Sequence, residues 1–78
     1  AKLNPESHET FNLLGMTLSE KGLRGPAETA FRKALQLQPK YPNAHYNLAV
    51  AYAAHQPPSM ELARWHYDRA IALGAGSP

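Results

Sequence analysis

The chain has 78 residues and a net charge of +2, which is only a weak indication of acidic partners. It has no cysteine, so disulfides and thiolate metal sites are excluded, and its longest apolar run (residues 48–54) is too short to cross a membrane. Its apolar residues are mostly alanine and leucine, with little valine or isoleucine. This composition predicts one small helical domain with a marginal core, and it does not assign a compartment.

Proline, glycine and polar capping residues divide the chain into four expected helices. They run from Asn4-Pro5 to about Lys21, from Gly25-Pro26 to just before Pro39, from Pro42 to about His55-Gln56, and from a Ser59 cap to Gly74. The connections are short, so consecutive helices should be antiparallel neighbours in an all-α fold.

An internal repeat relates the two halves of the chain. The first and third helices match at a spacing of 34: Phe11 with His45, Leu14 with Leu48, Gly15 with Ala49, and Leu18 with Tyr52. The second and fourth match at 36: Ala27 with Ala63, Phe31 with Tyr67, and Ala34 with Ala70. The two extra residues fall in the turn that contains "HQPPS", where an insertion is least costly.

Gly15 lies in the middle of an apolar helix face, where glycine costs about 1 kcal/mol relative to alanine. We expect small residues to face small residues across each pair of helices, so that the backbones approach closely. The small residues are Gly15, Ala49, Ala27, Ala34, Ala63 and Ala70. The large residues expected to fill the space on either side are Phe31, Tyr67, Leu14, Leu48, Leu18 and Tyr52.

These residues resemble tetratricopeptide repeats, a family built from 34-residue helix–turn–helix units. The first unit carries the full pattern: Phe11, Leu14-Gly15, Leu18, Ala27, Phe31, Ala34 and Pro39. The second carries Leu48-Ala49, Tyr52, Ala63, Tyr67 and Ala70, and departs from the pattern at His45, at the insertion and at Ala75. The resemblance implies two antiparallel repeat units (8–41 and 42–75), with 1–7 as the tail of a preceding repeat and 76–78 as a tail. We therefore expect a segment of a longer array, the alternative being a complete two-repeat protein.

The family binds partners in a concave groove lined by the first helix of each unit. The positions that this implies are Glu9, Asn12, Met16, Ser19 and Glu20, and Asn43, Tyr46, Val50, Ala53 and Ala54. Tyr46 is the expected anchor for a peptide, its alternative being a tyrosine that only faces solvent. Asn12 and Asn47 are candidates to bond a peptide backbone, although a bond between helices is the preferred interpretation for Asn47. Some members of the family bind C-terminal carboxylates through a clamp of lysine and asparagine side chains. Such a clamp is not expected here, because Asn12 and Met16 occupy the positions of that lysine and asparagine.

The remaining polar and aromatic residues predict no chemistry. No two histidines are three or four apart, so no helical metal pair is expected, and His45 should be a packed core histidine. Ser59, His55 and Asp68 do not form a recognisable catalytic motif. Trp65 either packs on Pro57-Pro58 or is an exposed hot spot for a partner. Cations and acids alternate on the second and fourth helices (Arg32, Lys33, Arg64, Arg69, Glu28, Glu61 and Asp68), which predicts a solvated convex face.

The sequence thus predicts a non-catalytic scaffold that binds a protein or peptide, without a cofactor, nucleic acid or membrane contact. Two alternatives stay open. One is self-association into a homo-oligomer through the exposed ends of the repeat pair, and the other is an accessory role to a catalytic or membrane domain elsewhere in the parent chain.

Overall fold

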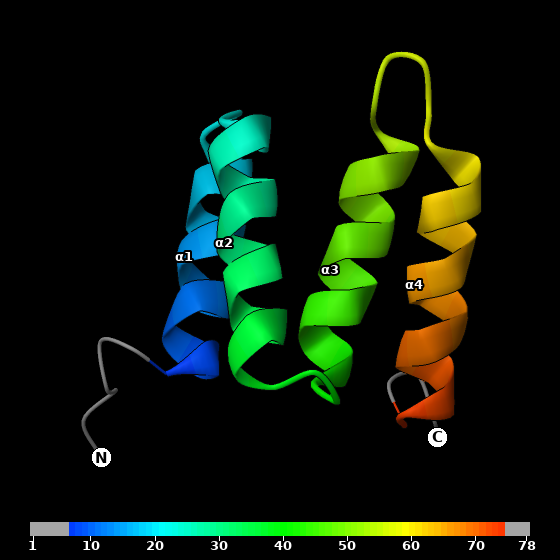
Figure 1. Cartoon of the computed structure of the whole chain (residues 1–78). Coiled ribbons are helices and arrows are strands. Elements are labelled where there is room, and N and C mark those ends of the chain that lie inside the picture. The colour runs from blue at the N-terminus through cyan, green and yellow to red at the C-terminus, as the bar shows by residue number, and fades with distance from the viewer. Residues whose placement is uncertain (1–6, 75–78) are drawn as a thin grey trace.

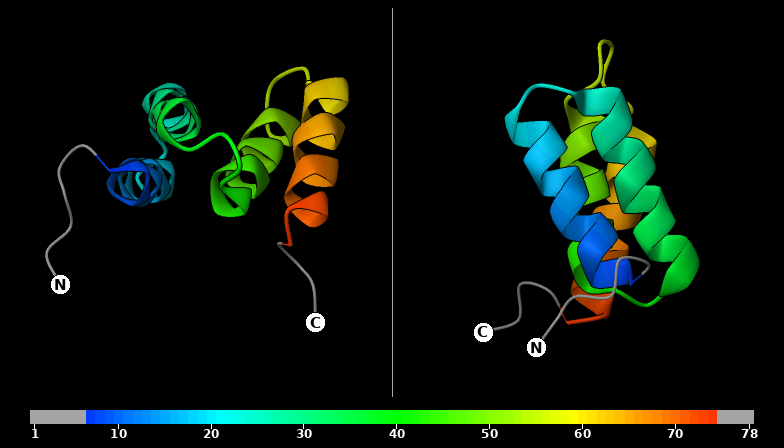
Figure 2. Two further views of the ribbon diagram at one scale, coloured as in Figure 1. Left: turned by 60° about the horizontal axis from the view of Figure 1, so that its bottom comes forward. Right: turned by 90° about the vertical axis from the view of Figure 1, so that its left-hand side faces the viewer.

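The structure is a computed structural model that describes residues 7–74, and these fold into four α-helices. The helices are α1 (His8–Glu20), α2 (Arg24–Leu37), α3 (Pro42–Ala53) and α4 (Met60–Ala72). Helices α1 and α2 form one antiparallel hairpin, α3 and α4 form a second, and α2 packs against α3 (Figure 1). Figure 2 shows the two hairpins standing side by side. No strand occurs in residues 7–74, so the predicted all-α repeat fold is confirmed.

Local chemistry explains most of the helix ends. Ser7 caps α1, because its side chain accepts a hydrogen bond from the backbone N–H of Thr10 at 3.1 Å. Pro42 opens α3 as predicted. Gly22 and Gly74 follow α1 and α4 with φ of +79° and +109°, a left-handed conformation that glycine adopts without strain. The predicted Asn4-Pro5 start, the repeat tails and Ala75 lie outside the described residues.

Two predicted helix boundaries and the predicted cap at Ser59 differ from the structure. Helix α2 begins at Arg24, and α3 ends at Ala53, short of the expected His55. Ser59 is the residue that precedes α4, but its side chain makes no capping bond. Its Oγ atom instead lies 3.1 Å from Nδ1 of His55, which competes with the backbone for the hydroxyl.

The core lies between the helices of each hairpin and between α2 and α3. Leu48 has no exposed surface, and Phe31 and Tyr52 are 3% and 7% exposed. Ala27 and Ala63 complete this cluster, and Leu18 and Leu35 pack against it from the side. Alanines let the helices of a hairpin approach, while the few large side chains fill the space between the hairpins.

Gly15 is buried, but the prediction that it faces another small residue is wrong. A Cβ atom added to Gly15 would lie 2.4 Å from Cε1 and 2.6 Å from Cδ1 of Phe31. The ring of Phe31 therefore lies directly on the glycine backbone. The glycine makes room for the one large aromatic side chain of α2, and the burial of that ring offsets the lower helix propensity.

Two residues expected in the seam are half exposed instead. Leu14 is 46% exposed and Tyr67 is 48% exposed, whereas Phe31, the counterpart of Tyr67, is 3% exposed. Helix α3 covers the side of the first hairpin on which Phe31 lies. No described helix covers α1 beyond Leu14 or the second hairpin beyond Tyr67. The repeat pattern predicts which face of a helix carries the packing residues, but the burial of each side chain also depends on whether a neighbouring helix covers it.

Candidate functional site

An uncharged hollow of about 420 Å³ has walls formed by α1, α3 and α4. It is lined by Asn12, Met16, Asn43, Tyr46, Asn47, Tyr67 and Ile71. Five of these seven side chains are groove residues that the sequence predicts on the first helix of each unit. The sequence does not predict the contributions of Tyr67 and Ile71, because the family pattern places α4 wholly behind α3. We refer to this hollow as the groove site.

Asn12 and Asn47 bond each other across the two hairpins. The amide Nδ2 of Asn47 donates to Oδ1 of Asn12 at 3.0 Å, and Asn12 is only 4% exposed. The amide Nδ2 of Asn12 is directed at Sδ of Met16, 3.7 Å away. Both polar atoms of the Asn12 amide thus have contacts within the chain, and its expected bond to a peptide stays a prediction. Asn47 forms the helix–helix bond that was the preferred interpretation for it, and it is half-buried at the edge of the groove site.

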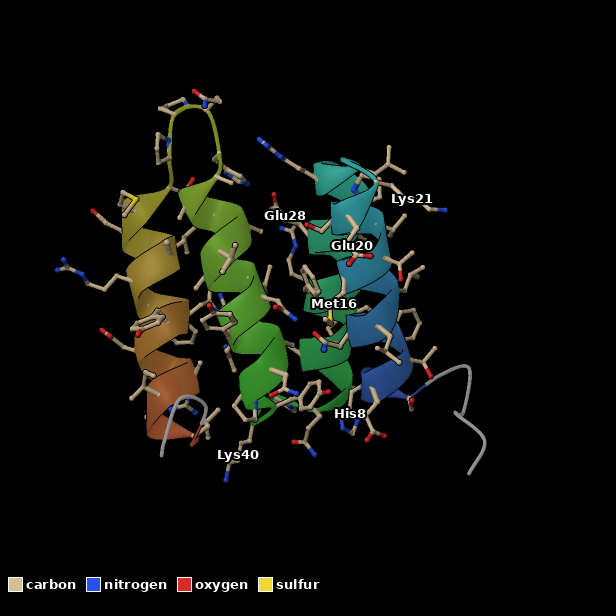
Figure 3. All side chains as sticks on the ribbon, turned by 180° about the vertical axis from the view of Figure 1, so that it is seen from behind. His8, Met16, Glu20, Lys21, Glu28 and Lys40 are labelled. Atoms are coloured by element: carbon tan, nitrogen blue, oxygen red, sulfur yellow. The ribbon has the colours of Figure 1, made fainter. Side chains whose placement is uncertain are left out.

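Aromatic rings form the wall of the groove site on the second hairpin. The rings of Tyr46 and Tyr67 are 6.3 Å apart and both are about half exposed, at 46% and 48%. Met16 points into the space between the hairpins, while Lys21 points away from it (Figure 3). The lining of the groove site is thus apolar surface with hydroxyl and amide groups among it.

The other predicted groove residues lie elsewhere. Val50 and Ala53 line a neighbouring hollow on the α3–α4 face, and Ser19, Glu20 and Ala54 line a third hollow between the two hairpins. Glu9 is exposed and lines none of the three. Helical periodicity places these residues on approximately the right side. The twist between the hairpins then distributes them over separate hollows.

Glu28 is buried, so its predicted place on a solvated face is wrong. It is 7% exposed, its Oε2 bonds Nε2 of His55, and its Oε1 lies 3.6 Å from the guanidinium of Arg32. Figure 3 shows Glu28 pointing into the space between the hairpins. His55 in turn contacts Ser59, so this chain of bonds ties the α3–α4 turn to α2. His55 and Ser59 do not line the groove site, and their contacts within residues 7–74 are explained by this structural role.

His45 and His66 form a pair that the sequence does not reveal. His45 is 4% exposed, which confirms it as a packed histidine, and its Nε2 lies 2.8 Å from the carbonyl oxygen of Pro39. A carbonyl only accepts, so Nε2 of His45 carries a proton. Its Nδ1, 3.0 Å from Nδ1 of His66, then accepts a hydrogen bond from His66. Burial, and secondarily the electrostatic interaction with His45, lower the pKa of His66 from its usual value of 6.5.

Trp65 is 57% exposed and rests on these histidines. Its ring lies edge-on to His66, with centroids 4.8 Å apart, and to His45 at 5.9 Å. The structure thus gives Trp65 a packing surface on the histidine pair. A role for its exposed side in binding stays a prediction.

The described residues contain no group of three or more potential metal-binding side chains. Over the same range, every helix is too short or too polar to cross a membrane.

Sequence comparison agrees with the class of fold described above. Residues 27–56 match the family model described as TPR repeat, which confirms the resemblance to tetratricopeptide repeats. This matched region runs from α2 through α3 and holds most of the inter-hairpin contact. Repeats of this class, together with the relatives below, support a protein–protein interaction module and give no support to catalysis.

The relatives found by sequence are receptors. The chain is 40% identical over 50 residues to a peroxisomal targeting signal receptor of Candida glabrata and 38% identical over 50 residues to that of Saccharomyces cerevisiae. Each match covers 64% of this chain but only 8% of the length of the relative. No solved structure gave a significant match to the chain.

Proposed function

We propose that this segment binds an extended peptide of a partner protein in the groove site and performs no catalysis. The fold, the TPR repeat match and relatives that are receptors of a targeting signal support a peptide as the ligand. The proposal keeps the predicted division into units at 8–41 and 42–75. The groove site would be one part of a longer binding surface, since the chain spans only 8% of those relatives.

The observation that carries the proposal is the bond between Asn12 and Asn47. It fixes the side chain of Asn47 by its N–H group at 3.0 Å. Within residues 7–74 the Oδ1 atom of Asn47 has no hydrogen-bond partner, so it remains as an acceptor. A held amide at the edge of an apolar hollow suits the backbone N–H of an extended peptide, because little rotamer entropy is lost on binding.

The side chains around Asn47 define the peptide residue that would enter the hollow. Met16, Tyr46 and Ile71 are 45%, 46% and 43% exposed, and no charged side chain lines the groove site. An apolar side chain of the peptide would cover these surfaces, with Tyr46 as the main anchor. Rigid aromatic side chains of this kind commonly dominate binding energy at interfaces.

The test is a selection from a phage-displayed library of random linear peptides, followed by anisotropy titrations with the enriched peptides. We expect enriched peptides to share an apolar residue. Tyr46→Ala should weaken their binding about tenfold or more, because anchor truncations typically cost more than ~1.4 kcal/mol. Leu62→Ala is the matched control, since Leu62 is 48% exposed on α4 and does not line the groove site.

Both variants should keep the circular dichroism spectrum and melting temperature of the original chain. The proposal is wrong if no peptide family is enriched above an unrelated helical protein. It is equally wrong if Tyr46→Ala binds the enriched peptides as tightly as the original chain does.

A further inference from the structure

Met16 lies where the groove site adjoins a second hollow. It lines the groove site together with Asn12 and Tyr46, and it also lines the hollow of about 240 Å³ between the two hairpins. Asn47 is the other residue that these two hollows share. The side chain of Met16 is 45% exposed and points into the space between the hairpins (Figure 3). A ligand in either hollow would therefore meet this thioether.

The sulfur of Met16 already has a hydrogen-bond donor directed at it. The Nδ2 amide group of Asn12 lies 3.7 Å from Sδ of Met16, and Oδ1 of Asn12 accepts from Nδ2 of Asn47 at 3.0 Å. The Asn12 side chain is buried, so these two bonds hold it in place. Thioether sulfur is only a weak acceptor, and the N–H group that Asn12 directs at it is therefore bonded only weakly.

Oxidation of the sulfur would give this donor a better acceptor. A sulfur lone pair attacks one oxygen of hydrogen peroxide, the O–O bond breaks, and the departing hydroxide takes the remaining hydroxyl proton and leaves as water. The sulfur loses two electrons and becomes a polar sulfoxide, while the peroxide is reduced. An oxygen on Sδ that faces Asn12 would accept its N–H group, so the bonds from Asn47 through Asn12 to Met16 would still join the hairpins.

The same oxygen would change the surface that a peptide meets. No charged side chain lines the groove site, and Met16, Tyr46 and Ile71 supply much of its exposed apolar surface. A sulfoxide replaces one of these surfaces by a hydrated polar group, which an apolar side chain of a peptide would have to dehydrate. Oxidation should therefore weaken peptide binding while the fold stays in place.

The composition of the chain supplies an internal reference for this chemistry. The chain has no cysteine and two methionines, Met16 and Met60, so its sulfur oxidation is confined to these two side chains. Met60 is 61% exposed at the start of α4 and lines neither the groove site nor the hollow between the hairpins. Met60 is thus open to the same oxidant without facing a peptide in the groove site.

We propose that Met16 is a reversible oxidation site whose sulfoxide form lowers the affinity of the groove site for an apolar peptide residue. This inference rests on the proposed function, because it concerns the regulation of the same site. The reverse reaction is that of a methionine sulfoxide reductase, in which the sulfoxide oxygen leaves as water while a dithiol is oxidised to a disulfide. Peptide binding would then respond to the balance between peroxide and reductase.

Anisotropy titrations with the peptides enriched by phage display, before and after treatment of the full chain with hydrogen peroxide, test the proposal. Mass spectrometry of proteolytic fragments should show the gain of one oxygen at Met16. The oxidised chain should bind the peptides about fivefold more weakly and keep its helical circular dichroism spectrum. Incubation with methionine sulfoxide reductases specific for each sulfoxide epimer, with dithiothreitol as the dithiol, should restore the original affinity.

Two leucine variants assign the effect to one sulfur. Met60→Leu keeps Met16 as its oxidisable methionine, so peroxide should lower its affinity as much as that of the original chain. Met16→Leu sets its own baseline affinity, and peroxide should leave that baseline unchanged. The proposal is overturned if Met16 does not gain oxygen, if its oxidation leaves the affinity unchanged, or if Met16→Leu responds equally. Titration of the untreated chain tests the proposed function separately, because peptides that bind it without any response to peroxide would refute the oxidation site alone.

Discussion

Replacing Gly15 by alanine should destabilise this chain, although alanine is the better helix former. The new Cβ atom would lie 2.4 Å from Cε1, 2.6 Å from Cδ1 and 2.9 Å from Cζ of Phe31. Ordinary carbon–carbon contacts are about 3.5–4.0 Å, so the ring must move by about 1 Å. Phe31 is 3% exposed and belongs to the core cluster, so its neighbours must move with it.

The expected magnitude follows from two opposing effects. Overpacking a tight core costs about 1–3 kcal/mol, and the gain in helix propensity returns about 1 kcal/mol. The net loss should therefore be about 1 kcal/mol in the free energy of unfolding. For a domain of this size that corresponds to a fall of about 4–8 °C in melting temperature. Thermal and urea unfolding followed by circular dichroism measure both quantities.

Two further variants separate ring contact from a general effect of glycine. Gly25→Ala is the matched control, because no atom lies within 4 Å of the added Cβ atom, and it should be neutral or stabilising by up to about 1 kcal/mol. Phe31→Leu leaves room for the methyl group that Gly15→Ala adds, so the double variant should lose less stability than the two single losses together. A Gly15→Ala chain that melts at or above the original temperature would refute the account of ring packing.

Three other substitutions should affect stability in measurable ways. Glu28→Ala should lower the free energy of unfolding by about 1 kcal/mol in urea titrations, because it removes the acceptor that ties His55 to α2. Asn47→Ala should cost about 1–3 kcal/mol, because it leaves the buried Oδ1 of Asn12 without its donor. The pKa of His66 lies below 6.5 in the folded chain, so the unfolded chain binds this proton first and stability should fall as pH drops through about 6.5. His66→Asn should make stability less dependent on pH over that range, as urea titrations at about pH 7.5 and about pH 5 would show.

Each of these predictions has an outcome that contradicts it. Glu28→Ala and Glu61→Ala should differ, because Glu61 is exposed, and equal effects would mean that the bond to His55 contributes nothing. Asn47→Ala at full stability would show that water satisfies Asn12. An unchanged pH dependence in His66→Asn would contradict the assignment of the pH response to His66.

The positions of the helices and turns were predictable from the sequence, because they depend on local chemistry. Pro42, Gly22 and Gly74 mark helix ends through their own backbone constraints, and the spacing of Leu14 and Leu48 reveals the repeat without knowledge of any contact. The groove site was predictable only in part. Helical periodicity places Asn12 and Tyr46 on one side of the molecule, but it does not tell which of them is covered by a neighbour.

Contacts between helices were not predictable, because they join residues far apart in sequence. The pairs Asn12–Asn47 and His45–His66 connect residues 35 and 21 positions apart, and each depends on the crossing angle of two helices. Glu28 was misplaced for a related reason. An acid four residues before Arg32 is typical of an exposed helix, and nothing local shows that His55 will cover it.

The two-residue insertion, which breaks the repeat pattern, explains why the interface between the hairpins is specific. It falls in the α3–α4 turn, and that turn supplies both His55, which bonds Glu28, and Ser59, which contacts His55. The shorter α1–α2 turn carries Lys21 at the position that corresponds to His55. A stack of identical units would repeat one contact at every interface. In this chain both the turn residue, His55, and the acid that it bonds, Glu28, differ from the residues at the equivalent positions of the other unit. The second hairpin therefore fits the first in a way that a copy of α1 cannot reproduce.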